Sequence, residues 1–342
     1  MKAAARRAAI RAGLRSCSPV EFDHPASLWN LAAEQTSQGD PFCCRTEWAL
    51  SFHEAFYPQR PLHLCESQHS VVAFAERVDA AIGRLLEPLE SMWFFGCPLL
   101  GAHAVELLDA FLGERADGPD APAVLLSGLL PGGSLLRGIQ KTFRSRHEIV
   151  RLGPTVLCSA SLEGGIDGFL ARRSGLFRRR LQHAQRRAAQ SGVTFERFAP
   201  RSAAEAAAIY ARMVAVEAAS WKGIGDCGMT QPGSREFYAR MLRRLAVSGA
   251  GRVMLARCGG KDIGFIFGGV AGAVYRGQQF SFAEDWRTFS IGNLLQLEQL
   301  RWLCEEGAAR YDMGPRMDYK RHWTEIETRI EARLLRPKSG AA

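Results

Sequence analysis

The chain lacks any uncharged apolar run of about 18 residues, so the sequence predicts no integral membrane segment. No Cys-x-x-Cys pair or Cys/His cluster has the spacing of metal ligands, and we therefore expect no metal. The nine cysteines are an odd number, which excludes a complete set of disulfides within one chain. Reduced thiols are typical of the cytosol, so a cytoplasmic location is predicted.

Acidic residues are missing from the N-terminus. The segment 1–16 contains five basic residues: Lys2, Arg6, Arg7, Arg11 and Arg15. It also lacks the apolar stretch of a secretory signal. Its Arg/Ala content fits an organelle transit peptide or a frayed basic helix on a bacterial protein, and we prefer the second interpretation. Residues 1–20 are thus predicted to be a basic, flexible N-terminus.

Acidic residues are also missing from residues 168–195. This segment carries seven arginines: Arg172, Arg173, Arg178, Arg179, Arg180, Arg186 and Arg187. They cannot all lie on one face of a helix. They form either a surface for RNA, an acidic lipid or a glycan carrier, or an ordinary solvated helix face, which we prefer. The net charge of +9 favours anionic partners without choosing among phosphates, CoA, nucleic acid and lipid headgroups.

The length of 342 residues indicates about two domains, and the hydrophobic content of 47% is enough for a substantial core. The first lobe is predicted at 21–155, with helices and strands in alternation. Periodicity predicts helices within 24–56 and at 102–115 and 133–143, and strands at 61–67, 70–78, 91–101 and 122–129.

The second half contains a regular order of helices and strands. We expect helices at 169–192, 202–221, 234–249 and 293–307, and strands at 193–199, 252–260, 261–272, 273–282, 309–314 and 329–337. The segment Gly259-Gly260-Lys261-Asp262 predicts a hairpin between two of these strands.

Three blocks of the second half carry a family resemblance: the basic helix 169–192, the segment Glu217 to Gly225, and residues 275–323. With this order of elements, the chain resembles an acyltransferase of the GNAT superfamily, in the branch that includes CelD-like cellulose-biosynthesis acyltransferases and is related to the FemAB transferases. The resemblance implies an α/β (α+β GNAT-like) fold of two lobes, each a mixed, mostly antiparallel sheet flanked by helices. The acyltransferase lobe is then expected at 156–338.

The resemblance also implies a reaction. An acyl group moves from acetyl-CoA or another acyl-CoA to an amine or hydroxyl by direct attack. The acceptor is a small molecule, a peptide or a glycan precursor. Two alternatives stay open: a FemAB-like transferase that uses aminoacyl-tRNA, with tRNA as its partner, and a non-catalytic binding protein with the GNAT fold.

The expected donor site lies where a strand gives way to a helix. Its residues are Arg287, Ser290, Ile291, Gly292 and Asn293. Free N–H groups and the macrodipole at a helix start favour a phosphate, and Gly292 permits a close approach. The alternative is that Ser290 only caps the helix and Gly292 only turns the chain. The GNAT pyrophosphate loop usually reads QxxGxG/A, and the single glycine here leaves room for a donor other than acetyl-CoA.

Acyl transfer needs a group that accepts the acceptor's proton and a donor for the developing oxyanion. The predicted bases are, in order, Asp312, Glu284 and Asp285; the alternative for Asp312 is a loop carboxylate that accepts backbone hydrogen bonds in its turn. Tyr319 is suited to protonating the leaving thiolate, and Lys320 to stabilising the oxyanion or gripping a phosphate. The FemAB resemblance favours Lys320, and the alternative is a solvated lysine above a packed tyrosine.

The resemblance places Trp221 and Lys222 on the acceptor side. Glu217 precedes Trp221 by one helical turn on the same face. Gln279, on the strand before the donor loop, completes the predicted substrate-binding set. The alternative is that Trp221 is a core anchor at a helix end.

Overall fold

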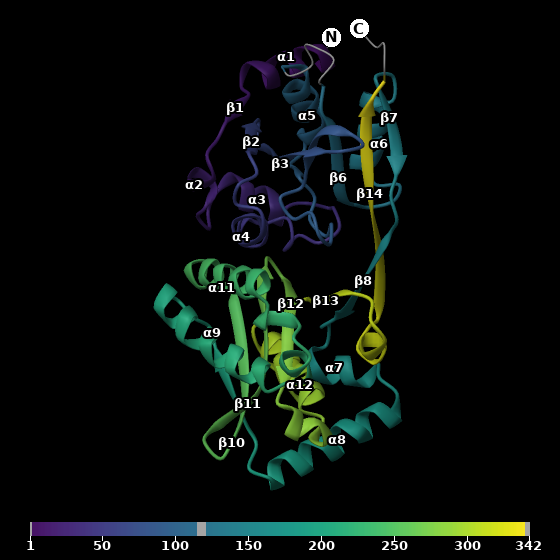
Figure 1. The fold of residues 1–342 in the computed structure, drawn as a ribbon. Helices are drawn as coiled ribbons and strands as arrows, with labels where there is room; N and C mark the ends of the chain where they lie inside the picture. The colour runs from purple at the N-terminus through teal and green to yellow at the C-terminus, as the bar shows by residue number, and fades with distance from the viewer. Residues whose placement is uncertain (1, 115–120, 339–342) are drawn as a thin grey trace. The chain divides into compact units, whose positions relative to one another are not determined.

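The computed structural model describes residues 2–114 and 121–338 (Figure 1). This part of the chain divides into two compact units. The first lobe comprises the residues up to 155 together with those from 329 onward, and the second lobe comprises residues 156–328. Residues 329–337 differ from the expected division, because they pair within the first lobe's sheet instead of closing the second lobe.

The first lobe is a mixed sheet with helices around it. Its strands are β1 (Arg15–Ser16), β2 (Leu62–Ser67), β3 (Ser70–Asp79), β4 (Gly83–Glu87), β5 (Leu99–Leu100), β6 (Ala123–Leu129), β7 (His147–Arg151) and β14 (Ile326–Pro337). Its helices are α1 (Lys2–Ala12), α2 (Pro19–Phe22), α3 (Leu28–Glu34), α4 (Thr46–Phe56), α5 (Ala104–Gly113) and α6 (Ser134–Phe143). The sheet order is β1-β2-β3-β4-β6-β14, and among these described strands only β4 and β6 pair in parallel.

Most of the predicted first-lobe elements are present. The antiparallel pair β2–β3 is confirmed by its register, which sets Leu62 opposite Ala75. Helix α1 occupies much of the segment expected to be flexible, and Ile10 on it is fully buried; Met1 lies outside the described residues.

The predicted strand at 91–101 is wrong except for β5. The chain there winds around the buried carboxylate of Glu90, which accepts hydrogen bonds at 2.5–3.2 Å from the backbone N–H groups of the four residues Met92, Trp93, Phe94 and Phe95. These N–H groups are therefore satisfied by a side chain, and no neighbouring strand is needed.

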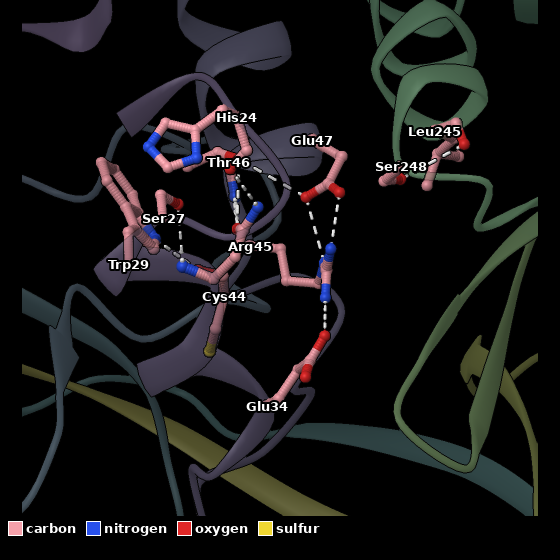
Figure 2. Close-up of polar contacts among 11 residues, drawn as sticks. His24, Ser27, Trp29, Glu34, Cys44, Arg45, Thr46, Glu47, Leu245 and Ser248 are labelled. Atoms are coloured by element: carbon pink, nitrogen blue, oxygen red, sulfur yellow. Dashed lines mark hydrogen bonds and ion pairs between the residues drawn. The ribbon is translucent and has the colours of Figure 1, made fainter. Parts of the chain in front are cut away.

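Hydrogen bonds and ion pairs connect α3 to the start of α4 (Figure 2). Trp29 donates its indole N–H to the carbonyl oxygen of Cys44 at 2.7 Å. Arg45 pairs with Glu47 at 2.6 Å and also with Glu34. Because Arg45 and Glu47 are both nearly inaccessible to solvent, each charge depends on the other for compensation.

The second lobe is built around a second mixed sheet. Its strands are β8 (Thr155–Ser161), β9 (Thr194–Phe198), β10 (Gly251–Cys258), β11 (Lys261–Ala271), β12 (Val274–Phe282) and β13 (Arg310–Pro315), in the order β8-β13-β12-β11-β10-β9. Its helices are α7 (Gly165–Ala171), α8 (Gly175–Gln190), α9 (Ala203–Ala218), α10 (Trp221–Ile224), α11 (Pro232–Val247) and α12 (Ile291–Glu305), with 3-10 turns η1 (Gly228–Thr230), η2 (Glu284–Phe289) and η3 (Asp318–His322). All pairs are antiparallel except β12–β13. The predicted fold class is thus confirmed for both lobes.

The structure corrects one predicted element of the second lobe and confirms another. The predicted helix at 169–192 is two helices, because Ser174 accepts a hydrogen bond from the Phe177 N–H at 3.2 Å and caps a new helix there. The hairpin between β10 and β11 is confirmed, and both Gly259 and Gly260 adopt the positive φ that such a turn requires.

The sheet of the second lobe is covered on both faces. The side chain of Phe267 on β11 meets Tyr238 of α11 on one face. On the other face Ile266 packs in one cluster with residues of α8 and α12. Gly264 brings α12 close, because a Cβ there would lie 2.8 Å from the side chain of Ile291. The start of α12 is therefore held against the end of β12, where the donor loop was predicted.

All nine cysteines belong to the described part of the chain, and none of them forms a disulfide bond there. None of the helices in residues 2–114 and 121–338 has both the length and the apolar character needed to cross a membrane.

Candidate active site

The parallel pair β12–β13 opens partway along its length. Val274, Tyr275 and Arg276 lie opposite residues 310–312, and beyond them the two strands are no longer paired. In β12 the register against β11 shifts by one residue, because Gln278 is an extra residue opposite the step from Phe267 to Gly268. Such a bulge bends the strand and re-aims its side chains. The divergence creates a recess between two strands that share one sheet.

A pocket of about 40 Å³ fills this recess. Its walls come from β11, β12, α12, β13 and the start of η3: Ile266, Gly277, Gln278, Gln279, Phe280, Gln296, Tyr311, Met313, Tyr319 and Lys320. The amide nitrogen of Gln278 is buried there without a hydrogen-bond partner. The pocket therefore offers several side-chain amides and one amine to a ligand. Three of the predicted site residues, Gln279, Tyr319 and Lys320, line it.

Lys320 is the charged side chain of this pocket. It is only 6% exposed, and its Nζ donates a hydrogen bond to the carbonyl oxygen of Pro315 at 2.7 Å. Burial, assisted by the nearby positive charge of Arg276, lowers the pKa of Lys320 to about 8. An ammonium group with this pKa holds its proton at neutral pH and releases it readily, which suits proton transfer to a leaving group.

Tyr319 precedes Lys320 in the chain, and its side chain is more exposed to solvent. Its ring packs edge-on against Phe280 at 5.5 Å between centroids. Desolvation raises the pKa of Tyr319 to about 12, so the phenol keeps its proton across the neutral range. Tyr319 can therefore donate a hydrogen bond in the pocket, but it is a weaker acid than Lys320.

Asp312, ranked first as a base, lies outside the lining of the pocket. Its carboxylate accepts a hydrogen bond from the backbone N–H of Gly314 at 2.8 Å and lies 3.5 Å from Nε of Arg276. The side chains of Asp312 and Arg276 are 5% and 4% exposed. The turn at Gly314 has φ +74°, and a Cβ there would come within 2.5 Å of the Arg276 guanidinium. This geometry is that of a buried ion pair which fixes the turn, as the alternative interpretation of Asp312 anticipated.

Glu284 and Asp285 also lie away from the pocket walls. Glu284 accepts a hydrogen bond from Arg287 at 3.0 Å, and its own backbone N–H donates to the carbonyl oxygen of Ala219. Asp285 is exposed in η2. The structure thus brings neither carboxylate to the atoms that line the recess.

The predicted donor loop lies on the surface at the start of α12. Ser290 adopts φ +59°, a left-handed conformation that is uncommon for a residue with a side chain. In the spacing Arg287-x-x-Ser290-x-Gly292, this serine stands where the GNAT loop usually has its first glycine. The loop therefore keeps a glycine-like backbone, with Arg287 exposed beside it and Asn293 exposed in the first turn of α12.

Gly292 and Ile291 face inward. A Cβ on Gly292 would lie 3.0 Å from the ring of Phe280 and 3.1 Å from that of Phe282. Ile291 is completely buried in the cluster between α8, α12 and the sheet. Gly292 is thus needed for packing α12 on β12, and the backbone atoms of this loop and the side chains of Arg287, Ser290 and Asn293 remain for a ligand.

The predicted substrate-binding residues form a connected group, with one exception. Nζ of Lys222 donates to the side-chain oxygen of Gln279 at 3.0 Å and lies 3.9 Å from the carboxylate of Glu217. Trp221 points away and is 57% exposed, so it is not the core anchor of the alternative interpretation. Gln279 lines the pocket, whereas Glu217 and Lys222 are not among its lining residues.

Sequence reasoning missed several residues of this region. Arg276 has a weak signal, since a charged residue interrupts an apolar strand, and that charge is buried beside Asp312. The hydroxyl oxygen of Tyr238 on α11 accepts a hydrogen bond from the side-chain amide nitrogen of Gln279 at 2.8 Å, and nothing in the local sequence of Tyr238 indicates this. Within the part of the chain that the structure describes, no group of three or more His, Cys, Asp or Glu is placed to hold a metal ion.

Comparison with protein families assigns the second lobe. Residues 175–321 match the family model described as an acetyltransferase (GNAT) domain. This segment of the second lobe is therefore similar to a GNAT acetyltransferase domain. The matched segment begins at α8 and ends in η3, so it contains the donor loop, the pocket and Lys320.

Solved structures of low sequence identity share the fold of nearly the whole chain. A conserved protein of unknown function from Bacteroides thetaiotaomicron matches with a TM-score of 0.63 at 9% identity, covering 94% of this chain and 99% of the other. FemX matches with a TM-score of 0.62 at 11% identity, covering 93% and 96%. L-PGS from Bacillus licheniformis matches with a TM-score of 0.55 at 12% identity, covering 93% of both chains. No curated protein matches in sequence. The fold shared with FemX agrees with the predicted FemAB-related branch, and the CelD-like part of the resemblance stays a prediction.

Proposed function

We propose that this protein transfers an acyl group from a CoA-type thioester to an amine or hydroxyl acceptor, in the pocket where β12 and β13 diverge. The observation that carries the proposal is the buried amine of Lys320 at the wall of that pocket. Beside it, the bulged segment of β12 presents backbone and amide groups to the same space. Fixed donors of this kind stabilise the charge that develops on a thioester carbonyl.

The reaction is a direct displacement. The acceptor's nitrogen or oxygen attacks the thioester carbon, the new C–N or C–O bond forms, and the C–S bond breaks. The acceptor's proton leaves to water, and the thiolate takes a proton from Lys320, which regains a proton from solvent. The pKa of about 8 makes Lys320 a better acid for this step than Tyr319, which we assign to a hydrogen bond with the acyl oxygen.

We assign Asp312 a positioning role instead of the role of base. Its carboxylate holds Arg276 and the turn at Gly314, after which the chain leads into η3, where Lys320 is the middle residue. This arrangement keeps a negative charge close to the buried Lys320 without exposing it to the acceptor.

The donor's phosphates are expected to dock at the start of α12, next to Arg287 and Asn293. Acetyl-CoA and longer acyl-CoAs, added to the whole chain, should raise the melting temperature, and free CoA should do so to a similar extent because it keeps the phosphates. Arg287→Ala should weaken binding by about tenfold, the effect of losing one charge-assisted contact. The matched control is Arg137→Ala, on α6 of the first lobe. If no acyl-CoA changes the melting temperature, the proposal that the donor is an acyl-CoA is wrong.

A second candidate is transfer of an aminoacyl group from tRNA. It rests on three exposed arginines of α8, Arg179, Arg180 and Arg186. The other arginines of the segment have structural partners: Arg172 and Arg173 bind Glu325, Arg178 binds carbonyl oxygens that end α7, and Arg187 binds the carbonyl oxygen of Thr288. Only part of the basic segment is therefore available to a polyanion.

If this second function holds, alanine at Arg179, Arg180 and Arg186 together should lower tRNA affinity and reduce the slope of log K against log salt by about two units. Filter binding over a range of salt concentrations measures both quantities. The control is a triple alanine variant of Arg137, Lys141 and Arg144, three exposed basic residues of the first lobe. If the two variants lower tRNA affinity equally, the α8 arginines are not a specific tRNA-binding surface.

A further inference from the structure

Lys222 contacts the wall of the proposed acyl pocket from behind. It lies in the short helix α10, and its Nζ donates hydrogen bonds to the side-chain oxygen of Gln279 at 3.0 Å and to the backbone oxygen of Phe280 at 2.9 Å. Both acceptors follow directly after Gln278, the bulged residue of β12. One ammonium group thus ties together the two residues that lead the strand out of its bulge.

Gln279 is held from the opposite side as well. Its amide nitrogen and the hydroxyl of Tyr238 lie 2.8 Å apart, and Tyr238 on α11 is only 6% exposed. With its oxygen bound by Lys222 and its nitrogen by Tyr238, the Gln279 amide has one orientation. The backbone of β12 at the pocket is therefore anchored to α10 and to α11.

The charge of Lys222 is balanced by a carboxylate that has few other partners. Glu217 is fully buried; one carboxylate oxygen accepts from the backbone N–H of Met229 at 3.1 Å, and the other has no hydrogen-bond partner. Glu90 of the first lobe, also buried, instead accepts four backbone N–H groups. Burying a carboxylate is costly unless it is paired, so Glu217 depends on Lys222, 3.9 Å away.

The turn at Gly228 leaves space for the carboxylate of Glu217. Gly228 has φ +79°, and a Cβ there would come within 2.4 Å of the carboxylate oxygen of Glu217. This turn, at the start of η1, requires glycine for both reasons. A buried acid with an unpartnered oxygen, built into a fixed turn beside a lysine, is a typical feature of functional positions.

We propose that Lys222 is a positioning residue: its ammonium group, balanced by Glu217, locks the bulge of β12 and so fixes the wall that meets the acyl group. The proposal rests on the function proposed above. Lys222 does not touch the reacting atoms; it acts through Gln279 and Phe280. Burial lowers the pKa of Lys222, and the negative charge of Glu217 opposes this shift.

The direct test is hydrogen exchange of the whole chain, followed by mass spectrometry on peptides that contain residues 277–280. Lys222→Met should speed exchange in these peptides by about tenfold or more, since a backbone anchor is lost while the side-chain volume is kept. Lys261→Met, at the exposed tip of the β10–β11 hairpin, is the matched control and should leave them unchanged. Unchanged exchange in Lys222→Met would overturn the proposal.

A second test uses the charge of Glu217 and also applies if Lys222→Met fails to fold. Three ionisable groups surround the Lys222 amine: Glu217 on α9, Cys227 before η1, and Tyr238 on α11, through Gln279. Glu217→Gln keeps the shape but removes the main influence that raises the pKa of Lys222. Exchange of residues 277–280 should then be slow at low pH and should accelerate at a lower pH than in the unaltered protein. A pH dependence identical to that of the unaltered protein would reject the role of the pair.

The kinetic readout separates this proposal from the proposed function. With an acyl-CoA that supports turnover, Lys222→Met should lower kcat by about tenfold or more and change the binding of free CoA by less than about twofold, because the phosphate site is elsewhere. If no acyl-CoA binds at all, the proposed function fails, while the exchange result still decides whether Lys222 holds β12. If acyl-CoA binds and kcat is unaffected by Lys222→Met, the positioning role fails alone.

Discussion

Lys320→Ala is expected to lower kcat for acyl transfer by about 100-fold or more, with little change in the affinity for free CoA. The reason is that Lys320 is the buried cation at the pocket wall, and its loss removes both the proton for the thiolate and a positive charge beside the carbonyl. Release of thiol from the acyl-CoA that supports turnover measures the effect. Lys261→Ala, on an exposed hairpin, is the control and should leave kcat unchanged. A loss below about threefold would show that the reaction does not use Lys320.

The same residue predicts a pH dependence. Because burial holds the pKa of Lys320 at about 8, the protonated form is lost above that pH, and kcat should fall as pH rises through about 8. Lys320→Ala should lack this limb. A rate that instead rises through pH 8 would make Lys320 the base of the reaction and not its acid.

Stability gives an independent check of the Lys320 environment. In the unfolded chain the pKa of this lysine returns toward 10.5, so the unfolded state binds the proton more tightly than the folded state does. The contribution of Lys320 to the free energy of unfolding is thus most favourable above pH 10.5 and is lost as pH falls to about 8. Subtracting the urea-unfolding data of Lys320→Met from those of the unaltered protein isolates this slope.

Asp312→Asn is expected to lower the free energy of unfolding by about 3 kcal/mol, because the buried guanidinium of Arg276 loses the charge that compensates it. Urea unfolding monitored by fluorescence measures the change. Replacing both partners, Arg276→Met with Asp312→Leu, should cost less than the sum of the two single changes, since neither charge is then left alone.

An exposed ion pair provides the comparison for Asp312. Arg287 and Glu284 lie 3.0 Å apart with side chains 73% and 35% exposed, so Glu284→Gln should change the free energy of unfolding by less than about 1 kcal/mol. If Asp312→Asn keeps full stability and abolishes turnover, Asp312 is the base that the sequence first suggested, and the positioning role is incorrect.

The sequence alone was informative where local patterns decide the structure. Alternation and glycine spacing located the hairpin of β10 and β11, and the helical periodicity located α9, α11 and α12. The resemblance then selected Lys320 and Gln279, which the structure places in one pocket. These predictions succeed because turn conformation, periodicity and motif order depend on neighbours in the chain.

The sequence was misleading where a residue's role depends on partners far along the chain. Gly292 was selected only as a phosphate-loop residue, which stays a prediction, and the sequence did not show that a Cβ there would meet the rings of Phe280 and Phe282 on β12. Residues 91–97 are as apolar as a strand, but the buried carboxylate of Glu90 accepts hydrogen bonds from the N–H groups of residues 92–95 and keeps the segment in a loop.

The sequence by itself determined the fold class, the order of elements in the second half and the choice of Lys320 as a candidate, since each depends on patterns within a few tens of residues. Tertiary structure alone decided that β12 and β13 pair in parallel and then separate, that Asp312 is buried against Arg276, and that β14 returns to the first lobe's sheet. The physical reason is that strand register and burial are set by contacts between segments up to hundreds of residues apart, which no local pattern records.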